Sequence, residues 1–270
     1  MLGNSPLSAT YRALPIVILS LAFTLVEIAP PSAHAAQIMV FSTPGMSSAL
    51  EVLAPRFEVA TGHKLIITFD TPGPMMRRVN AGDRFDAAIL GTSEIGEAEI
   101  DNLISRGKVV ADSRIVIART GVGVWIHPSA PKPDISTVAA FKRMLLEAKS
   151  ISYTKESGTG IYMARLMERL GIAEEMRAKT KTLGGGGQNP RAVAAGNVQY
   201  GISVVTDGMG LPGVELLGLL PQEIERWSTY VGGVAVDAND PAAARAFIKF
   251  LVSPENASVL KSKGWEILPD

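Results

Sequence analysis

Short apolar runs that alternate with amphipathic helical segments constrain the fold of this chain most. The run 38–41 is followed by a Ser-Thr-Pro-Gly loop and then by apolar residues at helical spacing over 49–57. The same order recurs at 65–69 and 75–79, and a third β-rich run covers 85–90. Strand–turn–helix units in this order form parallel sheets with helices on their faces. The sequence therefore predicts an α/β fold.

The pattern continues through the second half of the chain. Further strands are predicted at 115–118, 123–127, 151–153, 200–205 and 230–236. Helices are predicted at 141–148, 161–170, from Arg191, and at 241–251 and 257–263. We expect the strands at 115–118 and 123–127 to carry the chain out of a first lobe.

The N-terminus has the organisation of a secretory signal. Arg12 is the only charge before the apolar run 13–26, and Ala33-His34-Ala35 gives a small-residue cleavage site. This order predicts a signal peptide over 1–35 and a periplasmic protein. The alternative is a transmembrane anchor, but the run is shorter than the roughly 20 residues that a span needs. The chain has no cysteine, which excludes a lipoprotein anchor.

The charge composition limits the classes of partner that the chain can bind. The 26 basic and 26 acidic residues balance, and no basic stripe is present. Binding nucleic acid needs such a stripe, and a polybasic membrane anchor needs a similar cluster. We therefore predict no nucleic-acid partner and no membrane insertion after signal cleavage. The absence of cysteine also excludes thiolate metal sites.

Catalytic motifs are not evident. His63 and His127 lie apart in the sequence, and Ser157 lacks the first glycine of a G-x-S-x-G elbow. The glycine run 184–187 is not followed by the G-K-[ST] of a phosphate-binding loop. We therefore predict a protein that is not an enzyme and that holds no metal or cofactor. A secreted hydrolase-like enzyme stays open, and it requires a histidine or carboxylate within hydrogen-bond reach of a cleft hydroxyl.

Four loops rich in Gly, Ser, Thr and Pro open predicted helices, at 42–45, 71–74, 157–160 and 188–190. Helix N-termini carry unpaired N–H groups and a partial positive charge. In open α/β sheets such loops meet beyond the carboxyl ends of the strands. The sequence therefore predicts a cleft for a small anion.

The motifs around these loops resemble the molybdate-binding group of ABC transporter periplasmic components, which have the type II periplasmic binding fold. The resemblance covers residues 37–269. It rests on V-F-S-T-P-G-M-S-S-A-L from Val40, I-T-F-D-T-P-G-P-M from Ile67 and A-G-D-R-F-D-A-A-I-L from Ala81. G-T-G-I-Y, G-N-V-Q-Y-G-I-S-V-V-T-D and A-F-I-K-F-L-V-S-P-E-N-A add to it.

The resemblance implies two α/β lobes, each with a central mixed, mostly parallel sheet, joined by crossover hinge strands. It places lobe I at 36–118 and 232–270, and lobe II at 119–231. It also implies hinge closure on a small anionic ligand, a molybdate-like oxyanion or a small organic acid, and delivery by a monomer to ABC permease and ATPase subunits. A ligand sensor that uses the same fold without transport stays open.

The resemblance also assigns candidate ligand-binding residues. These are Ser42, Thr43, Gly45, Thr71, Gly73, Thr159, Asn189 and Val204. Gly45 stands where the family has a serine, and Val204 stands where a tyrosine often completes the site. From its own chemistry, Arg191 or Arg77 would suit a carboxylate through paired hydrogen bonds.

Overall fold

The computed structural model describes residues 1, 3, 35–91, 99–185 and 187–268. Residues 33–270 belong to one compact unit. The predicted signal peptide lies almost wholly outside the described residues, so its prediction is not tested. Across the described ranges, no helix is both long and apolar enough to cross a bilayer.

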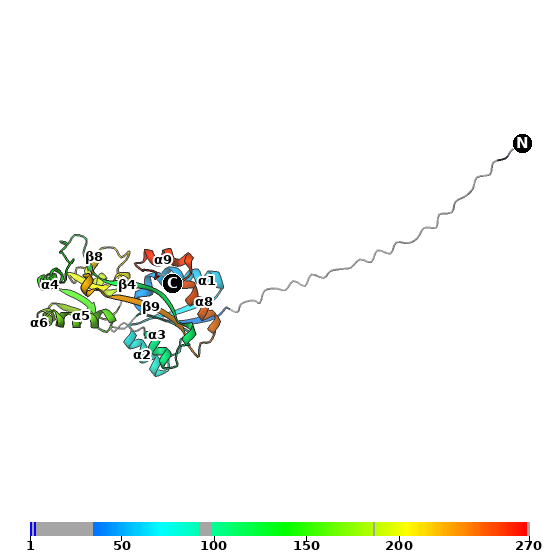
Figure 1. The fold of residues 1–270 in the computed structure, drawn as a ribbon, viewed down its shortest axis with the longest axis horizontal. Helices are drawn as coiled ribbons and strands as arrows, with labels where there is room; N and C mark the ends of the chain where they lie inside the picture. Colours follow the sequence, from blue (N-terminus) through cyan, green and yellow to red (C-terminus); the bar gives the residue numbers. More distant parts are fainter. Residues whose placement is uncertain (2, 4–34, 92–98, 186, 269–270) are drawn as a thin grey trace. The chain divides into compact units, whose positions relative to one another are not determined.

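One continuous sheet runs through the molecule. Its strands, in spatial order, are β2 (Lys64–Phe69), β1 (Gln37–Ser42), β3 (Ala87–Gly91), β9 (Trp227–Val234), β4 (Ile115–Ile126), β7 (Tyr200–Val204), β5 (Ile151–Thr154) and β6 (Thr180–Leu183), with β8 (Glu215–Leu219) also paired to β4. β1 pairs in parallel with β2 and β3, and β5 pairs in parallel with β6 and β7. The long strands β4 and β9 are antiparallel and link the two parallel groups (Figure 1).

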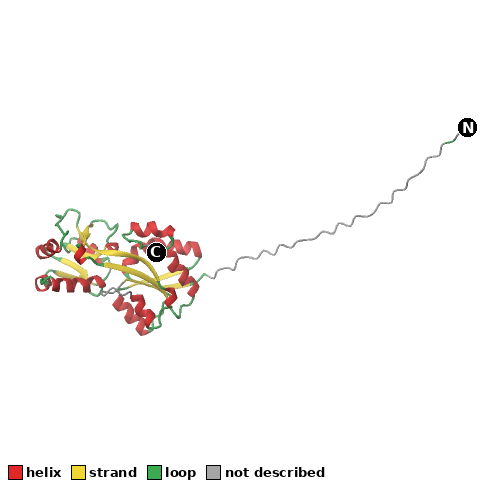
Figure 2. Cartoon of the chain, viewed as in Figure 1, coloured by secondary structure: helices red, strands yellow, loops and turns green. Residues whose placement is uncertain are grey.

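Helices cover both faces of this sheet (Figure 2). They are α1 (Ser47–Thr61), α2 (Pro72–Ala81), α3 (Glu99–Ser105), α4 (Val138–Glu147), α5 (Gly158–Arg169), α6 (Ala173–Arg177), α7 (Gln188–Ala194), α8 (Pro241–Leu251) and α9 (Ala257–Ser262). Short 3-10 turns include η1 (Pro44–Met46) and η3 (Val205–Asp207).

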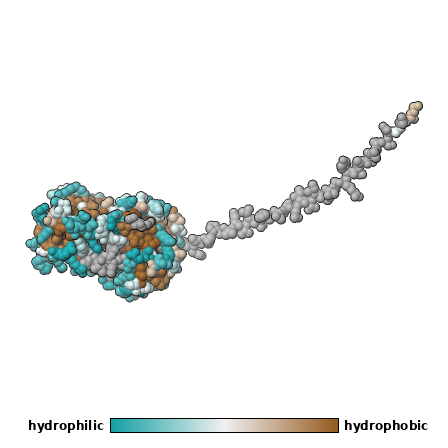
Figure 3. Space-filling model, viewed as in Figure 1, coloured by the Kyte–Doolittle hydropathy of each residue, from teal (hydrophilic) through white to brown (hydrophobic). Residues whose placement is uncertain are grey.

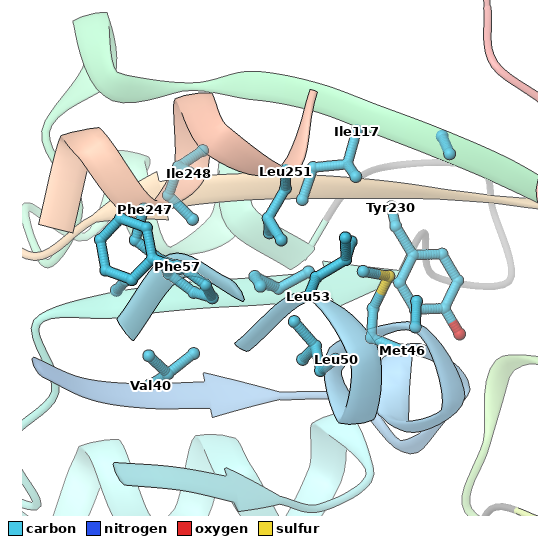
Figure 4. Packing of buried hydrophobic residues seen from close by; sticks show 14 of the residues in the cluster. Val40, Met46, Leu50, Leu53, Phe57, Ile117, Tyr230, Phe247, Ile248 and Leu251 are labelled. Atoms are coloured by element: carbon cyan, nitrogen blue, oxygen red, sulfur yellow. The ribbon is translucent and has the colours of Figure 1, made fainter. Parts of the chain in front are cut away.

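The first lobe has a separate hydrophobic core on each face of its strands. Ile38 and Val40 of β1 point to one face, where they pack with α1, α8 and α9. Phe41 points to the other face and packs with α2 and α3. This alternation follows the two-residue period of a strand. Figure 4 shows the first core, in which Phe57 and Phe247 meet edge to face at 5.2 Å.

The second lobe is built in the same way. Val122, Val124 and Ile126 of β4 pack with α4, α5 and α6 on one face. Trp125 points to the opposite face and packs with Val193 of α7. The prediction of two α/β lobes joined by crossover strands is therefore confirmed. The residue boundaries between the lobes stay a prediction.

Several predicted elements differ in extent. The runs 115–118 and 123–127 form the single strand β4, because Arg119 to Gly121 continue the pairing with β9. α5 begins at Gly158 rather than at 161, since the Ser157 hydroxyl caps it by accepting from the Gly160 N–H. The strands β6 and β8 and the helices α3 and α6 were not predicted. β6, for example, alternates weakly, with Lys181 exposed between two threonines.

The surface in Figure 3 carries mostly hydrophilic side chains with separate apolar patches. Exposed large apolar residues include Val59, Ile66 and Val236. Apolar residues scattered in this way are normal on a monomeric protein.

Asp86 ties the first lobe together. Its side chain is 1 % exposed. One carboxylate oxygen accepts from the Met39 N–H at 2.7 Å, and the other accepts from the Asn239 N–H at 2.6 Å. The aspartate therefore links β1, β3 and the segment after β9. These hydrogen bonds give a structural reason for the aspartate at position 86, the final Asp of the A-G-D-R-F-D motif.

We expect Asp86→Ala to lower the free energy of unfolding by roughly 2–5 kcal/mol, because it leaves two backbone N–H groups without acceptors. Asp83→Ala in the same motif is the control, since Asp83 makes an exposed ion pair with Arg78. It should change stability by less than about 1 kcal/mol. Urea unfolding of both variants checks this, and equal losses would contradict the assignment.

Candidate functional site

A cavity of about 70 Å³ lies where the predicted loops of both lobes meet. The first lobe contributes the loops after β1 and β2 and the end of β3 at Gly91, and the linking strand β9 contributes Tyr230. The second lobe contributes β7, the β5–α5 loop and the start of α7. The lining residues are Thr43, Pro44, Gly45, Thr71, Pro72, Gly91, Thr154, Ser157, Gly158, Thr159, Asn189, Ile202, Ser203, Val204, Asp207 and Tyr230. The predicted convergence of strand-end loops on one gap is therefore present.

The helix N-terminus of α5 supplies donors to this cavity. The Ser157 Oγ accepts from the Gly160 N–H at 3.1 Å, which closes the first turn. The N–H groups of Gly158 and Thr159 have no acceptor within the helix, as in any first turn. Gly160 is required here, because a Cβ at this position would overlap the Thr154 carbonyl oxygen. Close packing of α5 on β5 thus brings two amides to the cavity.

Buried polar atoms around the cavity lack partners. Within the described part of the chain, two buried atoms of the lining residues, Thr43 Oγ1 and Asn189 Oδ1, make no hydrogen bond. Thr43 is 5 % exposed and Asn189 is 1 % exposed. An unpaired buried polar group costs about 1–3 kcal/mol. Such groups point to a polar ligand that would pair with them.

Asp207 places a carboxyl group in the cavity. It lies at the end of η3 and is partly exposed, because the cavity opens onto it, although protein surrounds it on its other sides. Desolvation raises the pKa of Asp207 to about 6, while hydrogen bonds from the Gly187 N–H and the Ser203 hydroxyl partly oppose the rise. Among the described lining residues, Asp207 and Tyr230 are the ionisable ones.

Tyr230 brings a phenol to the same cavity from β9. Burial, with the nearby Asp207 charge, raises its pKa far above the ordinary value, so the hydroxyl keeps its proton. Its ring meets Trp265 edge to face at 4.6 Å. Figure 4 shows the ring at the edge of the core with its oxygen directed away from the aliphatic side chains. The nearby Thr43 and Ser228 hydroxyls act in the opposite direction and partly offset this rise in the Tyr230 pKa.

Most of the predicted ligand-binding residues border the cavity, and three do not. Those that line it are Thr43, Gly45, Thr71, Thr159, Asn189 and Val204. The Ser42 side chain instead lies inside the sheet and donates to the Thr43 carbonyl at 3.3 Å. Gly73 lies beside the ion pair between Arg77 and Glu156. Arg191 is exposed and does not line the cavity. Whether these residues bind a ligand stays a prediction.

Asp207 and Tyr230 were missed from the sequence. Asp207 ends the quoted G-N-V-Q-Y-G-I-S-V-V-T-D motif, so a carboxylate directly after a buried strand was an available signal. The residues around Tyr230 in the sequence do not indicate that it lines the cavity, because its position there depends on the pairing of β9 with β3. The phenol expected at position 204 therefore reaches the cavity from another strand.

The geometric condition set for an enzyme is met by Asp207. The Ser203 hydroxyl lies near enough to lower the pKa of the Asp207 carboxyl, and both residues line the cavity, although the Ser203 Oγ donates to the Val204 carbonyl at 3.4 Å. Neither of the two histidines among the described residues lines the cavity. His63 Nδ1 accepts from the Ala36 N–H at 3.1 Å, and His127 Nδ1 pairs with Ser129 at 2.8 Å.

Comparison with known proteins gives two kinds of relative. The chain is 29 % identical over 238 residues to "Aconitate isomerase" of Pseudomonas sp, with 86 % of this chain and 88 % of that protein covered. It is 25 % identical to the molybdate-binding protein ModA of Azotobacter vinelandii, with coverage of 87 % and 91 %. In structure it matches the Azotobacter vinelandii periplasmic molybdate-binding protein with a TM-score of 0.71 at 18 % identity, over 86 % of this chain and all of the other.

These relatives correct one prediction. The chain was predicted not to be an enzyme, and the relative named for isomerase activity overturns this. The prediction failed because the search for catalytic groups considered histidines, a serine elbow and helix carboxylates. No such motif marks a carboxylate like that of Asp207, whose pKa is raised by desolvation in the folded protein.

The structural match confirms the type II periplasmic binding fold. Residues 38–266 match the family described as bacterial extracellular solute-binding protein. The chain therefore belongs to the bacterial extracellular solute-binding protein family.

Proposed function

We propose that this chain is a periplasmic isomerase of a small unsaturated carboxylate, in which Asp207 removes a proton from one carbon and returns it to another. The observation that carries this proposal is the desolvated Asp207 carboxyl facing a cavity lined by hydroxyls and amides. The relative named aconitate isomerase supports the substrate class, since aconitate is an unsaturated tricarboxylate.

The environment of Asp207 suits a general base. A carboxylate with a pKa of about 6 is ionised near pH 7, yet it binds a proton more strongly than an ordinary aspartate. Proton transfer is most effective when the catalytic pKa lies near the working pH. A structural carboxylate would instead be expected to have cationic partners, and none lines the described cavity.

Hydroxyls and amides would hold the substrate. We assign carboxylate contacts to Thr43, Thr71, Thr159 and the Gly158 amide, all at the cavity. Hydrogen bonds to charged groups are worth roughly 1.5–3 kcal/mol each.

Binding requires the lobes to separate. The cavity has a volume of about 70 Å³, which is room for only a few waters. A six-carbon tricarboxylate is larger than that. We propose that lobe I (36–118 and 232–270) and lobe II (119–231) open and close about the crossover strands.

The reaction conserves atoms and electrons. Asp207 takes a proton from the methylene carbon that lies next to both a carboxylate and the double bond. The C–H electron pair forms a new double bond, and the old double bond shifts its electrons toward the carboxylate on its far carbon. Asp207 then returns the proton to that far carbon, and the original carboxylate is restored.

We expect the purified protein to interconvert cis- and trans-aconitate, and Asp207→Asn to lower kcat/KM by 10²–10⁴-fold, the range for general acid–base groups. In the wild type, kcat/KM should rise with pH through about 6, because the base acts only when ionised. Proton NMR in D₂O measures isomerisation and deuterium uptake together.

Glu156→Gln is the matched control for this experiment. Glu156 is an exposed carboxylate beside the loop that enters α5, and it does not line the cavity. Its substitution should leave kcat within about threefold, in line with the small worth of exposed ion pairs. An Asp207→Asn variant with wild-type turnover would refute the assignment of the base.

The same carboxyl should destabilise the fold when it is charged. Because the folded-state pKa exceeds the ordinary value of 3.8, folding favours the protonated form, and stability is lost as pH rises through about 6. Asp207→Asn should therefore be more stable than wild type near pH 8, by at most roughly 3 kcal/mol. Near pH 4 the two should agree. Urea unfolding at both pH values measures this, and a less stable variant near pH 8 would contradict it.

A second candidate is capture of an inorganic oxyanion for an ABC importer, with its permease and ATPase as partners. The molybdate-binding relatives and the size of the cavity favour it. Thermal shift separates the two candidates, since a ligand stabilises by RT ln(1 + [L]/Kd). Stabilisation by aconitate and not by molybdate supports the isomerase, and the reverse supports oxyanion capture.

A further inference from the structure

We propose that Tyr230 is the oxyanion donor of this site, and that Gly45 leaves the space in which its hydroxyl stands. The inference rests on the proposed function and adds a second catalytic residue to it. Removing a proton next to a carboxylate pushes negative charge onto the carboxylate oxygens. A fixed donor aimed at that charge stabilises the transition state more than the ground state.

The position of Tyr230 fits this role. Its side chain is 5 % exposed, and it lines the cavity that also holds Asp207. The ring is fixed by the core around α1 and by the edge-to-face contact with Trp265 at 4.6 Å. A donor held in this way needs no reorganisation when charge develops. Because its pKa is raised, the phenol is available as a donor over the whole working pH range.

Gly45 explains how the phenol can reach the cavity. A Cβ at position 45 would overlap the Tyr230 hydroxyl oxygen, and it would lie 3.0 Å from Tyr230 Cζ and 3.4 Å from Thr206 Oγ1. Any larger residue would therefore displace the phenol. A side chain at position 45 and the Tyr230 hydroxyl cannot occupy the same space. A serine at position 45 would supply a donor from the β1–α1 loop. In this chain position 45 is glycine, and the donor comes from Tyr230 of β9 instead.

The pair of Asp207 and Tyr230 matches the chemistry of allylic proton shifts. An aspartate base that works with a tyrosine donor in an apolar setting is the arrangement of ketosteroid isomerase, an unrelated enzyme that moves a proton along an allylic system. In this chain the two groups come from η3 of one lobe and β9 between the lobes. The substrate class is thus a carboxylate whose acidic methylene is bonded directly to a carbon–carbon double bond.

Tyr230→Phe tests the donor while it keeps the packed ring. With cis-aconitate as the probe, kcat should fall 10²–10³-fold, the usual loss for one oxyanion donor. KM should change by less than about threefold, and the pH midpoint set by Asp207 should persist. Tyr162→Phe is the matched control, since its hydroxyl donates to the Ile224 carbonyl outside the cavity.

A second measurement tests the position of the phenol. Gly45→Ala should lower Tm by several degrees in the Tyr230 background and by less in the Tyr230→Phe background, because the overlapping oxygen is gone. Equal losses in the two backgrounds would overturn the role given to Gly45.

The outcomes separate the inference from the proposed function. If the wild type turns over aconitate, Asp207→Asn does not, and Tyr230→Phe does, the role of Tyr230 as oxyanion donor is refuted and the proposed isomerase function stands. A wild type that neither isomerises aconitate nor takes deuterium into it would refute both. Loss of turnover in both variants, with KM retained in Tyr230→Phe, supports both.

Discussion

The antiparallel pairing of β4 with β9 is the interaction on which both the fold and the site depend. The two strands pair from Ile115 to Gly121, and β4 then continues into the second lobe to pair with β7. β9 pairs on its other side with β3, which places Tyr230 opposite Gly91. One ladder therefore joins the lobes and brings the phenol to the gap between them. A slip of one residue would turn Tyr230 to the opposite face of the sheet and remove it from the cavity.

Local sequence patterns were sufficient to predict the parts of the fold that form within one strand–loop–helix unit. The loop at Ser42 to Gly45, the end of α1 at Gly62 and the helix that follows Ser157 all depend on neighbours in sequence. The same patterns located Thr43, Thr71 and Thr159 at the cavity, because loops after parallel strands meet at one edge of a sheet. β6 and β8 were missed, since their stability comes from pairing rather than from an alternating apolar pattern.

The residues to which we assign the chemistry, Asp207 and Tyr230, could not be predicted in this way. Asp207 is an ordinary aspartate in the sequence, and its raised pKa comes from protein that surrounds it in three dimensions. Tyr230 reaches the cavity through a partner strand more than a hundred residues away in sequence. Gly45 was predicted as a ligand-binding residue in place of a serine, and the role that we propose for it depends on the position of Tyr230. The raised pKa of Asp207 and the position of Tyr230 depend on contacts between residues far apart in sequence, and patterns in a single sequence predict such contacts poorly.

A carboxylate in a cavity for anions creates a coupling that distinguishes a carrier from an enzyme. A bound anion disfavours the ionised form of Asp207, which raises its pKa further, and by reciprocity the protonated form binds anions more tightly. For a carrier this is a cost, because ligand affinity would fall as pH rises through about 6. For an isomerase it is an advantage, because repulsion from the substrate carboxylates makes Asp207 a stronger base in the complex than in the free protein. Asp207 is desolvated, and no cationic side chain is among the described residues that line the cavity, which supports the proton transfer proposed for this site.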